Sequence, residues 1–170
     1  MVSWQQFQEW PERPENGLRY ELHDGEVVEV PIPRPWEVKL ADCIERMIAR
    51  LVADRGVVTY AWPYRPAANL QYWVANIAYI PRAVWDSMPR EDWPVHAPPL
   101  IVEILSPSNS PAKVALQRIT AMSAGTQEFW IVNRDKQTVE ISRPDQVQIY
   151  RRGDVIPLFG GSLAVHEVFG

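Results

Sequence analysis

The sequence predicts a mixed α/β fold in which strands outnumber helices. Two stretches place apolar residues at helical spacing, and each lies between stretches with the alternation or the continuous apolar character of strands. The 170 residues, 46% of them hydrophobic, suit a single domain over residues 1–170 with enough core to fold alone. With one cysteine, Cys43, we expect no internal disulfide, and three dispersed histidines give no zinc-binding spacing.

The first half of the chain is expected to hold short elements around one long helix. A short helix is expected within residues 4–15, which prolines interrupt, and a β-hairpin over 19–30, where alternating residues flank Asp24-Gly25. Apolar residues recur at helical spacing over 37–54, so this stretch predicts an amphipathic helix that Gly56 ends. Strands are expected over 57–63 and 69–81.

The second half begins with an irregular segment that contains a helical turn near 83–88. The continuous apolar run over 100–105 is typical of a strand covered on both faces. Ser110 caps a helix that starts at Pro111 and ends at Gly125. Two further strands and two closing segments are expected at 128–133, 138–142, 146–152 and 162–169.

The charge balance and the lack of long apolar stretches narrow the function classes. A formal charge of −4 argues against strong nonspecific nucleic-acid binding, which depends on lysine and arginine, but leaves room for a locally basic cleft. The first residues do not form a signal peptide, and no stretch approaches the roughly 20 apolar residues of a membrane span. We therefore expect a cytoplasmic protein with no membrane partner.

Glu103 is the most informative single residue, because it lies inside the apolar run of residues 100–105. Burying an isolated carboxylate costs far more free energy than the packing of its apolar neighbours contributes. The group must therefore pair with another group, bind a cation or take part in chemistry. The simplest alternative is a structural acid satisfied by backbone N–H groups or by Arg118. The sequence favours a role in a functional site over that alternative.

Four segments carry motifs that occur together in one known family: residues 20–26, 75–80, 100–108 and 125–132. Together they resemble the Uma2 family of restriction endonucleases, in the PD-(D/E)XK nuclease superfamily. The likeness extends from Phe7 to Phe169, and its most specific part is the Val-Glu-Ile-Leu-Ser-Pro-Ser motif around Glu103. The resemblance implies a restriction-endonuclease-like mixed sheet flanked by helices, with an N-terminal β-hairpin.

What the resemblance implies about activity is Mg²⁺-dependent (or Mn²⁺-dependent) hydrolysis of DNA phosphodiester bonds. In such a site an Asp and a Glu hold the metal, which lowers the pKa of the attacking water, and a lysine offsets the charge that develops on the phosphate. Cutting both strands needs two sites, which a homodimer with twofold symmetry supplies.

This chain keeps part of that implied apparatus. Glu21 and Glu103 match the family's hairpin and strand carboxylates, whereas Asn76 stands in place of the acidic metal ligand and Gln117 in place of the helix lysine. Losing one charge about 4 Å from a cation forfeits roughly 4 kcal/mol per unit of cation charge at an effective dielectric near 20. Lys113, four residues before Gln117 on the same helix face, could replace the missing lysine or be an ordinary solvated residue.

Two hypotheses therefore stay open. The first is a metal-dependent restriction-type endonuclease with Glu103 and Asn76 on the metal, Glu21 in support, and Lys113 or Gln117 near the phosphate. The second is a nuclease-like fold that has lost catalysis and serves as a binding or oligomerisation module. Three of these residues also have purely structural explanations. Glu21 could be an exposed charge that keeps the hairpin soluble, Asn76 could cap the end of a strand, and His23 could be a residue of the hairpin turn.

Overall fold

A six-stranded mixed sheet forms the centre of the computed structural model, which describes residues 1–10, 18–107 and 109–170. Its strand order is β3-β4-β5-β6-β7-β8. The strands are β3 (Gly56–Tyr64), β4 (Trp73–Pro81), β5 (Leu100–Ile104), β6 (Glu128–Asn133), β7 (Thr138–Arg143) and β8 (Gln146–Arg151). Strands β5 and β6 run parallel, and the other neighbouring pairs are antiparallel. The predicted mixed fold class is confirmed.

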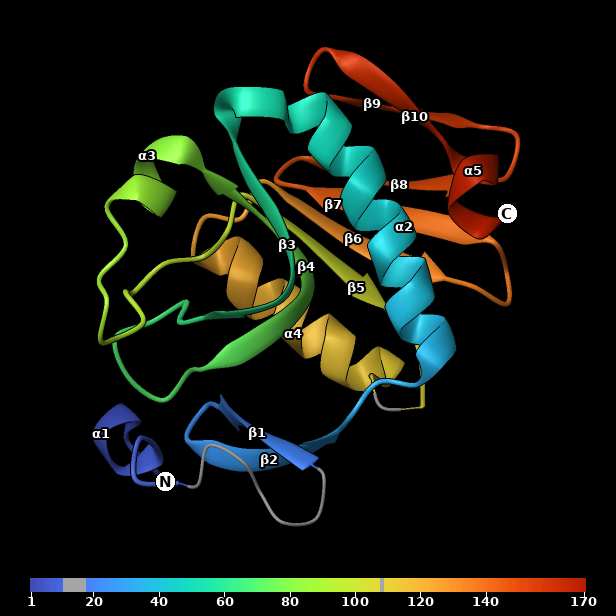
Figure 1. Ribbon diagram of the computed structural model, residues 1–170. Coiled ribbons are helices and arrows are strands. Elements are labelled where there is room, and N and C mark those ends of the chain that lie inside the picture. Colours follow the sequence, from blue (N-terminus) through green and yellow to red (C-terminus); the bar gives the residue numbers. More distant parts are fainter. Residues whose placement is uncertain (11–17, 108) are drawn as a thin grey trace.

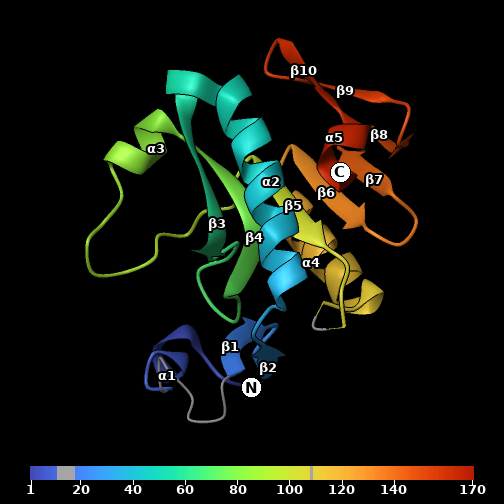
Figure 2. The same cartoon turned by 45° about the vertical axis from the view of Figure 1, so that its right-hand side comes forward.

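The two long helices cover opposite faces of this sheet (Figure 1 and Figure 2). Helix α2 (Pro35–Val52) is followed by a 3-10 turn over Ala53–Arg55, and α4 (Pro111–Ser123) supplies the crossover that the parallel pair requires. The side chain of Ser110 accepts a hydrogen bond from the Lys113 backbone N–H, as expected of a helix N-cap.

Strand β5 contributes to the packing on both faces, which explains its continuous apolar run. Its residues Leu100, Val102 and Ile104 belong to the core beneath α2, whereas Ile101 belongs to the core beneath α4. Because side chains alternate along a strand, Glu103 points to the same side as Ile101, toward α4. The local sequence thus places this carboxylate beneath a helix.

Two hairpins lie outside the main sheet. One pairs β1 (Leu18–His23) with β2 (Glu26–Pro31), and the other pairs β9 (Val155–Leu158) with β10 (Gly161–Ala164). The first hairpin is joined to the segment before β4, because the backbones of Leu22 and Tyr72 exchange two hydrogen bonds of 2.8 Å. Figure 1 shows this hairpin near the start of α4.

Most of the predicted elements are confirmed, and one predicted boundary is wrong. The stretch 69–72 is not part of the strand that follows it, since β4 begins at Trp73. The closing segment 162–169, for which no type of element was specified, is the end of a hairpin followed by the helix α5 (Val165–Phe169), and the preceding strand β9 was not predicted. The expected short helix is α1 (Trp4–Phe7), while the expected turn near 83–88 is α3 (Arg82–Asp86). Part of the stretch 4–15 lies outside the described residues.

Within the described residues, the helices are all too short or too polar to span a lipid bilayer.

Candidate active site

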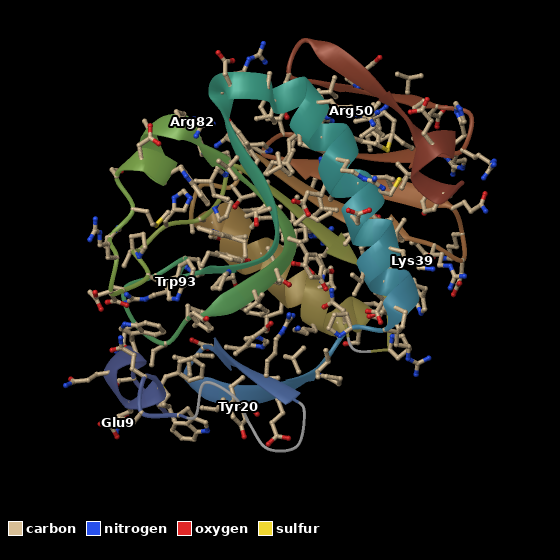
Figure 3. All side chains as sticks on the ribbon, viewed as in Figure 1. Glu9, Tyr20, Lys39, Arg50, Arg82 and Trp93 are labelled. Atoms are coloured by element: carbon tan, nitrogen blue, oxygen red, sulfur yellow. The ribbon has the colours of Figure 1, made fainter. Side chains whose placement is uncertain are left out.

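The five predicted site residues come together on the α4 side of the sheet. Asn76 on β4 donates its backbone N–H to Glu103 Oε1 (3.2 Å), and Gln117 on α4 donates Nε2–H to the same oxygen (2.7 Å). Glu21 on the hairpin is paired with Lys113, whose Nζ lies 3.2 Å from Glu21 Oε2. Residues far apart in the sequence therefore form one polar cluster. Figure 3 shows the side chains that fill the region between the hairpin, which carries Tyr20, and the sheet.

Glu103 is buried, with 1% of its surface exposed, and side-chain amides occupy both of its oxygens. Besides the hydrogen bond from Gln117 to Oε1, Asn109 donates Nδ2–H to Oε2 at 2.8 Å. Arg118 is not its partner, because that guanidinium pairs with Glu140 at 3.1 Å. The expectation of a carboxylate satisfied through Arg118 is thus wrong, whereas the expected backbone donor is present as the N–H of Asn76, beside the two side-chain amides.

Asn76 links two strands through its side chain. Its Oδ1 accepts the Ile104 backbone N–H at 2.7 Å, and the amide of Asn109 lies at 3.4 Å from the same oxygen. The residue therefore fills the structural role of an amide that satisfies the backbone, and it does so beside Glu103. The two alternatives for Asn76, a metal ligand and an amide that caps a strand end, therefore place its side chain at the same position, next to Glu103.

Burial dominates the electrostatics of Glu103. Desolvation raises its pKa from 4.5 to about 7, against the opposing effects of the Lys113 charge and the Asn109 hydrogen bond, while the Glu21 charge adds to the rise. The carboxyl group is therefore protonated in part of the molecules near neutral pH. Asn109 offers an acceptor for that proton after rotation of its amide, because its Oδ1 is buried with no hydrogen-bond partner among the described residues.

Glu21 has the opposite electrostatic balance. It is fully buried, so the reading of an exposed hairpin acid is wrong. Desolvation alone would raise its pKa, but the hydrogen bond with His23 (2.8 Å) and the charges of Lys113 and Arg19 together lower it. Arg19 Nη2 lies 3.3 Å from Glu21 Oε1. Glu21 is consequently held as a carboxylate within a shell of basic groups.

Sequence reasoning missed four members of this cluster, one of which is Arg19, the partner of Glu21 described above. His23 is not merely a turn residue, because it is buried, bonded to Glu21 and stacked on Trp73 with ring centroids 3.5 Å apart. Asn109 follows the Ser-Pro-Ser motif directly, which is a signal that could have pointed to it. Tyr64 accepts a hydrogen bond from Gln117 Nε2 at 3.2 Å, and nothing in its local sequence indicates this role.

The donor set does not fit a magnesium ion in this arrangement. Mg²⁺ requires near-octahedral oxygen coordination, usually with one or two carboxylates. Here the oxygens of Glu103 accept amide N–H groups, the Asn76 oxygen accepts a backbone N–H, and Glu21 is paired with the Lys113 ammonium. Within the described residues, no three His, Cys, Asp or Glu side chains group as a metal site would need.

A groove of about 530 Å³ opens beside α4, next to the start of that helix. One wall is α4 itself, and the floor is the face of β6, β7 and β8 that α4 leaves uncovered. Three basic side chains line the groove: Arg118, Lys136 and Arg151. Only Arg118 forms an ion pair with a described residue, Glu140, which also lines the groove. The groove therefore carries two cations that no described acid neutralises.

Comparison with known proteins identifies a family and solved structures of similar fold. The family model Uma2, described as "Putative restriction endonuclease", matches residues 4–166. A crystal structure described as "a putative nuclease belonging to DUF820", from Anabaena variabilis, is similar in fold, with a TM-score of 0.82 and 21% sequence identity over 99% of this chain and 98% of that one. No curated protein sequence matches the chain.

Proposed function

The chain belongs to the Uma2 family, and from this premise we propose that it is a nuclease-fold protein that binds DNA without cutting it. One observation carries this proposal: both oxygens of the Glu103 carboxylate are occupied by the amides of Gln117 and Asn109. A carboxylate that is saturated by hydrogen-bond donors, and partly protonated near neutral pH, is a poor ligand for a hard cation. Magnesium binding at Glu103 and Asn76 is therefore proposed to be weak or absent.

The second candidate is the metal-dependent endonuclease, acting as a homodimer. It is favoured by the proximity of the same residues, since Asn76, Gln117 and Glu103 are joined by hydrogen bonds. In that case the two amides would turn away to free the carboxylate, and Lys113 would face the phosphate. That rearrangement would break hydrogen bonds to a buried charge, each worth about 1.5–3 kcal/mol, so we place this candidate second.

Plasmid nicking in Mg²⁺ or Mn²⁺ distinguishes the two candidates. We expect the wild-type chain to nick supercoiled DNA no faster than its Glu103→Ala variant, which controls for contaminating nucleases. The double variant Asn76→Asp, Gln117→Lys restores a carboxylate and a cation and should gain nicking that Glu103→Ala abolishes. Nicking by the wild type that Glu103→Ala removes would establish the second candidate and end the first.

The proposed DNA contact runs along the groove beside α4. Lys136 lies in the turn between β6 and β7, and Arg151 lies on β8 as the cross-strand partner of Thr138 on β7. Two phosphate contacts would give a slope of about −2 when log affinity is plotted against log salt concentration. This weak, local electrostatic attraction is compatible with a formal charge of −4 for the whole chain.

Fluorescence anisotropy with a labelled DNA duplex tests the binding half of the proposal. Lys136→Glu should weaken binding at low salt and reduce the salt slope. Lys39→Glu is the matched control, because this exposed lysine lies on α2, on the opposite face of the sheet (Figure 3). If both variants lose the same amount of DNA affinity, the effect comes from net charge and not from the groove. If the wild type shows no detectable binding, DNA is not the partner.

A further inference from the structure

Lys113 occupies an unusual place for a lysine. It is the third residue of α4, after the N-cap Ser110, and a cation in the first turn is disfavoured by the positive end of the helix dipole. Its side chain is also largely buried, with 15% exposed. The stability of α4 therefore does not explain why a lysine occupies this position. The explanation must come from the groups that its ammonium contacts.

The ammonium pairs with one buried carboxylate and acts on a second through its charge. Its Nζ lies 3.2 Å from Oε2 of Glu21, and its charge is the strongest influence that opposes burial at Glu103. These two acids have 0% and 1% of their surface exposed, and they come from the hairpin and from the central strand β5. Burying two like charges together is costly unless a cation accompanies them. Lys113 supplies that cation from within the chain.

The same cluster holds oxygen atoms that its own hydrogen bonds do not use. Glu21 Oε1 and Asn109 Oδ1 are both buried without a hydrogen-bond partner among the described residues, although Arg19 Nη2 lies 3.3 Å from the former. The Asn109 amide is held at the site through its contact with Glu103. Carboxylate and amide oxygens are the ligands that hard divalent cations take.

We propose that the Lys113 ammonium takes the place of a divalent cation between Glu21 and Glu103, and that a neutral side chain at position 113 converts these acids and Asn109 into a divalent-cation site. In the wild type, an entering cation would meet the Lys113 charge and would have to displace it from Glu21. Without that charge, the cluster attracts the cation more strongly, although Arg19 and His23 still contact Glu21. The amides of Gln117 and Asn109 would have to turn away from Glu103 before it could bind the cation. The inference rests on the proposed function in one respect, namely that the wild-type protein binds no divalent ion between Glu21 and Glu103.

Thermal unfolding with and without MnCl₂ tests this inference without any nuclease assay. Lys113→Met removes the charge and keeps a long side chain. We expect its unfolding temperature to rise with MnCl₂, with an apparent affinity for Mn²⁺ at least roughly tenfold tighter than that of the wild type. Lys39→Met, at an exposed position of α2, is the matched control and should respond as the wild type does. Adding Glu21→Gln to Lys113→Met should abolish the gain.

Several outcomes would overturn the inference. The first is a folded Lys113→Met chain that binds Mn²⁺ no better than the wild type. The second is a wild type that already binds as tightly, which would also contradict the proposed weak magnesium site, and the plasmid assay would then show whether such binding leads to cleavage. If Lys113→Met and Lys113→Gln both stay unfolded in MnCl₂, the metal has failed to replace the ammonium, and the inference fails as well.

Discussion

The raised pKa of Glu103 predicts how the stability of the protein depends on pH. The carboxyl group has a pKa of about 7 in the folded chain and an ordinary value of 4.5 when exposed. Because the folded state binds this proton more tightly, the group's contribution to the free energy of unfolding is complete below about pH 4.5 and is lost as the pH rises through 7. The difference between the two pKa values corresponds to on the order of 3 kcal/mol.

Glu103→Gln removes this titration with little change in shape. The new side chain keeps an oxygen that can accept from Gln117 and Asn76, and its amide can donate to Asn109 Oδ1 once the Asn109 amide has rotated. Urea unfolding of both chains between about pH 5 and about pH 8 gives the free energy of unfolding at each pH. We expect the wild type to lose up to about 3 kcal/mol relative to the variant over this range.

The matched control is Glu26→Gln, at the exposed start of β2. It should follow the wild-type profile, since this side chain lies outside the buried cluster. If Glu103→Gln and the wild type instead give parallel profiles over the whole range, Glu103 is ionised throughout. The argument that burial raises the pKa of Glu103 would then be refuted, and with it the part of the proposed poor metal affinity that rests on protonation of this group.

The remaining predictions concern the scaffold, and each is measured by urea unfolding. Ile77→Ala should cost about 2–5 kcal/mol, because Ile77 is fully buried between strands and α2; a loss below about 1 kcal/mol would contradict that packing. Ser110→Ala should cost about 1 kcal/mol through loss of the helix cap, whereas Ser110→Asp should retain most of it. Gly56→Ala should destabilise strongly, since a Cβ there would press on the Ile80 carbonyl oxygen, and a neutral effect would contradict this close approach.

Local patterns were sufficient to predict most of the sheet and both long helices. The Asp24-Gly25 turn, the helical spacing of Ile44 and Ile48, and the cap at Ser110 each act over a few residues, so the sequence reveals them directly. The boundary of β4 was missed because Tyr72 forms a strand-like bridge to the hairpin rather than to the main sheet. Such a choice between partners depends on distant residues and leaves no local pattern.

The site was predictable to the extent that motifs marked it. The apolar neighbours of Glu103 indicated burial, and the family resemblance indicated Glu21, Asn76 and Gln117 as its neighbours. Sequence alone could not say that Lys113 would pair with Glu21 instead of Glu103, because that depends on where the hairpin lies against α4.

The attachment of the β1–β2 hairpin also has a consequence for motion. It forms no strand of the main sheet and is held by local contacts: the Leu22–Tyr72 backbone pair, the hydrogen bond from Gly25 to Leu70, the stack of His23 on Trp73 and the Glu21–Lys113 ion pair. Segments with few attachments open locally at less cost than central strands do. Amide protons of Leu22 should thus exchange with solvent before those of β5, and each such opening would briefly admit water to the carboxylates.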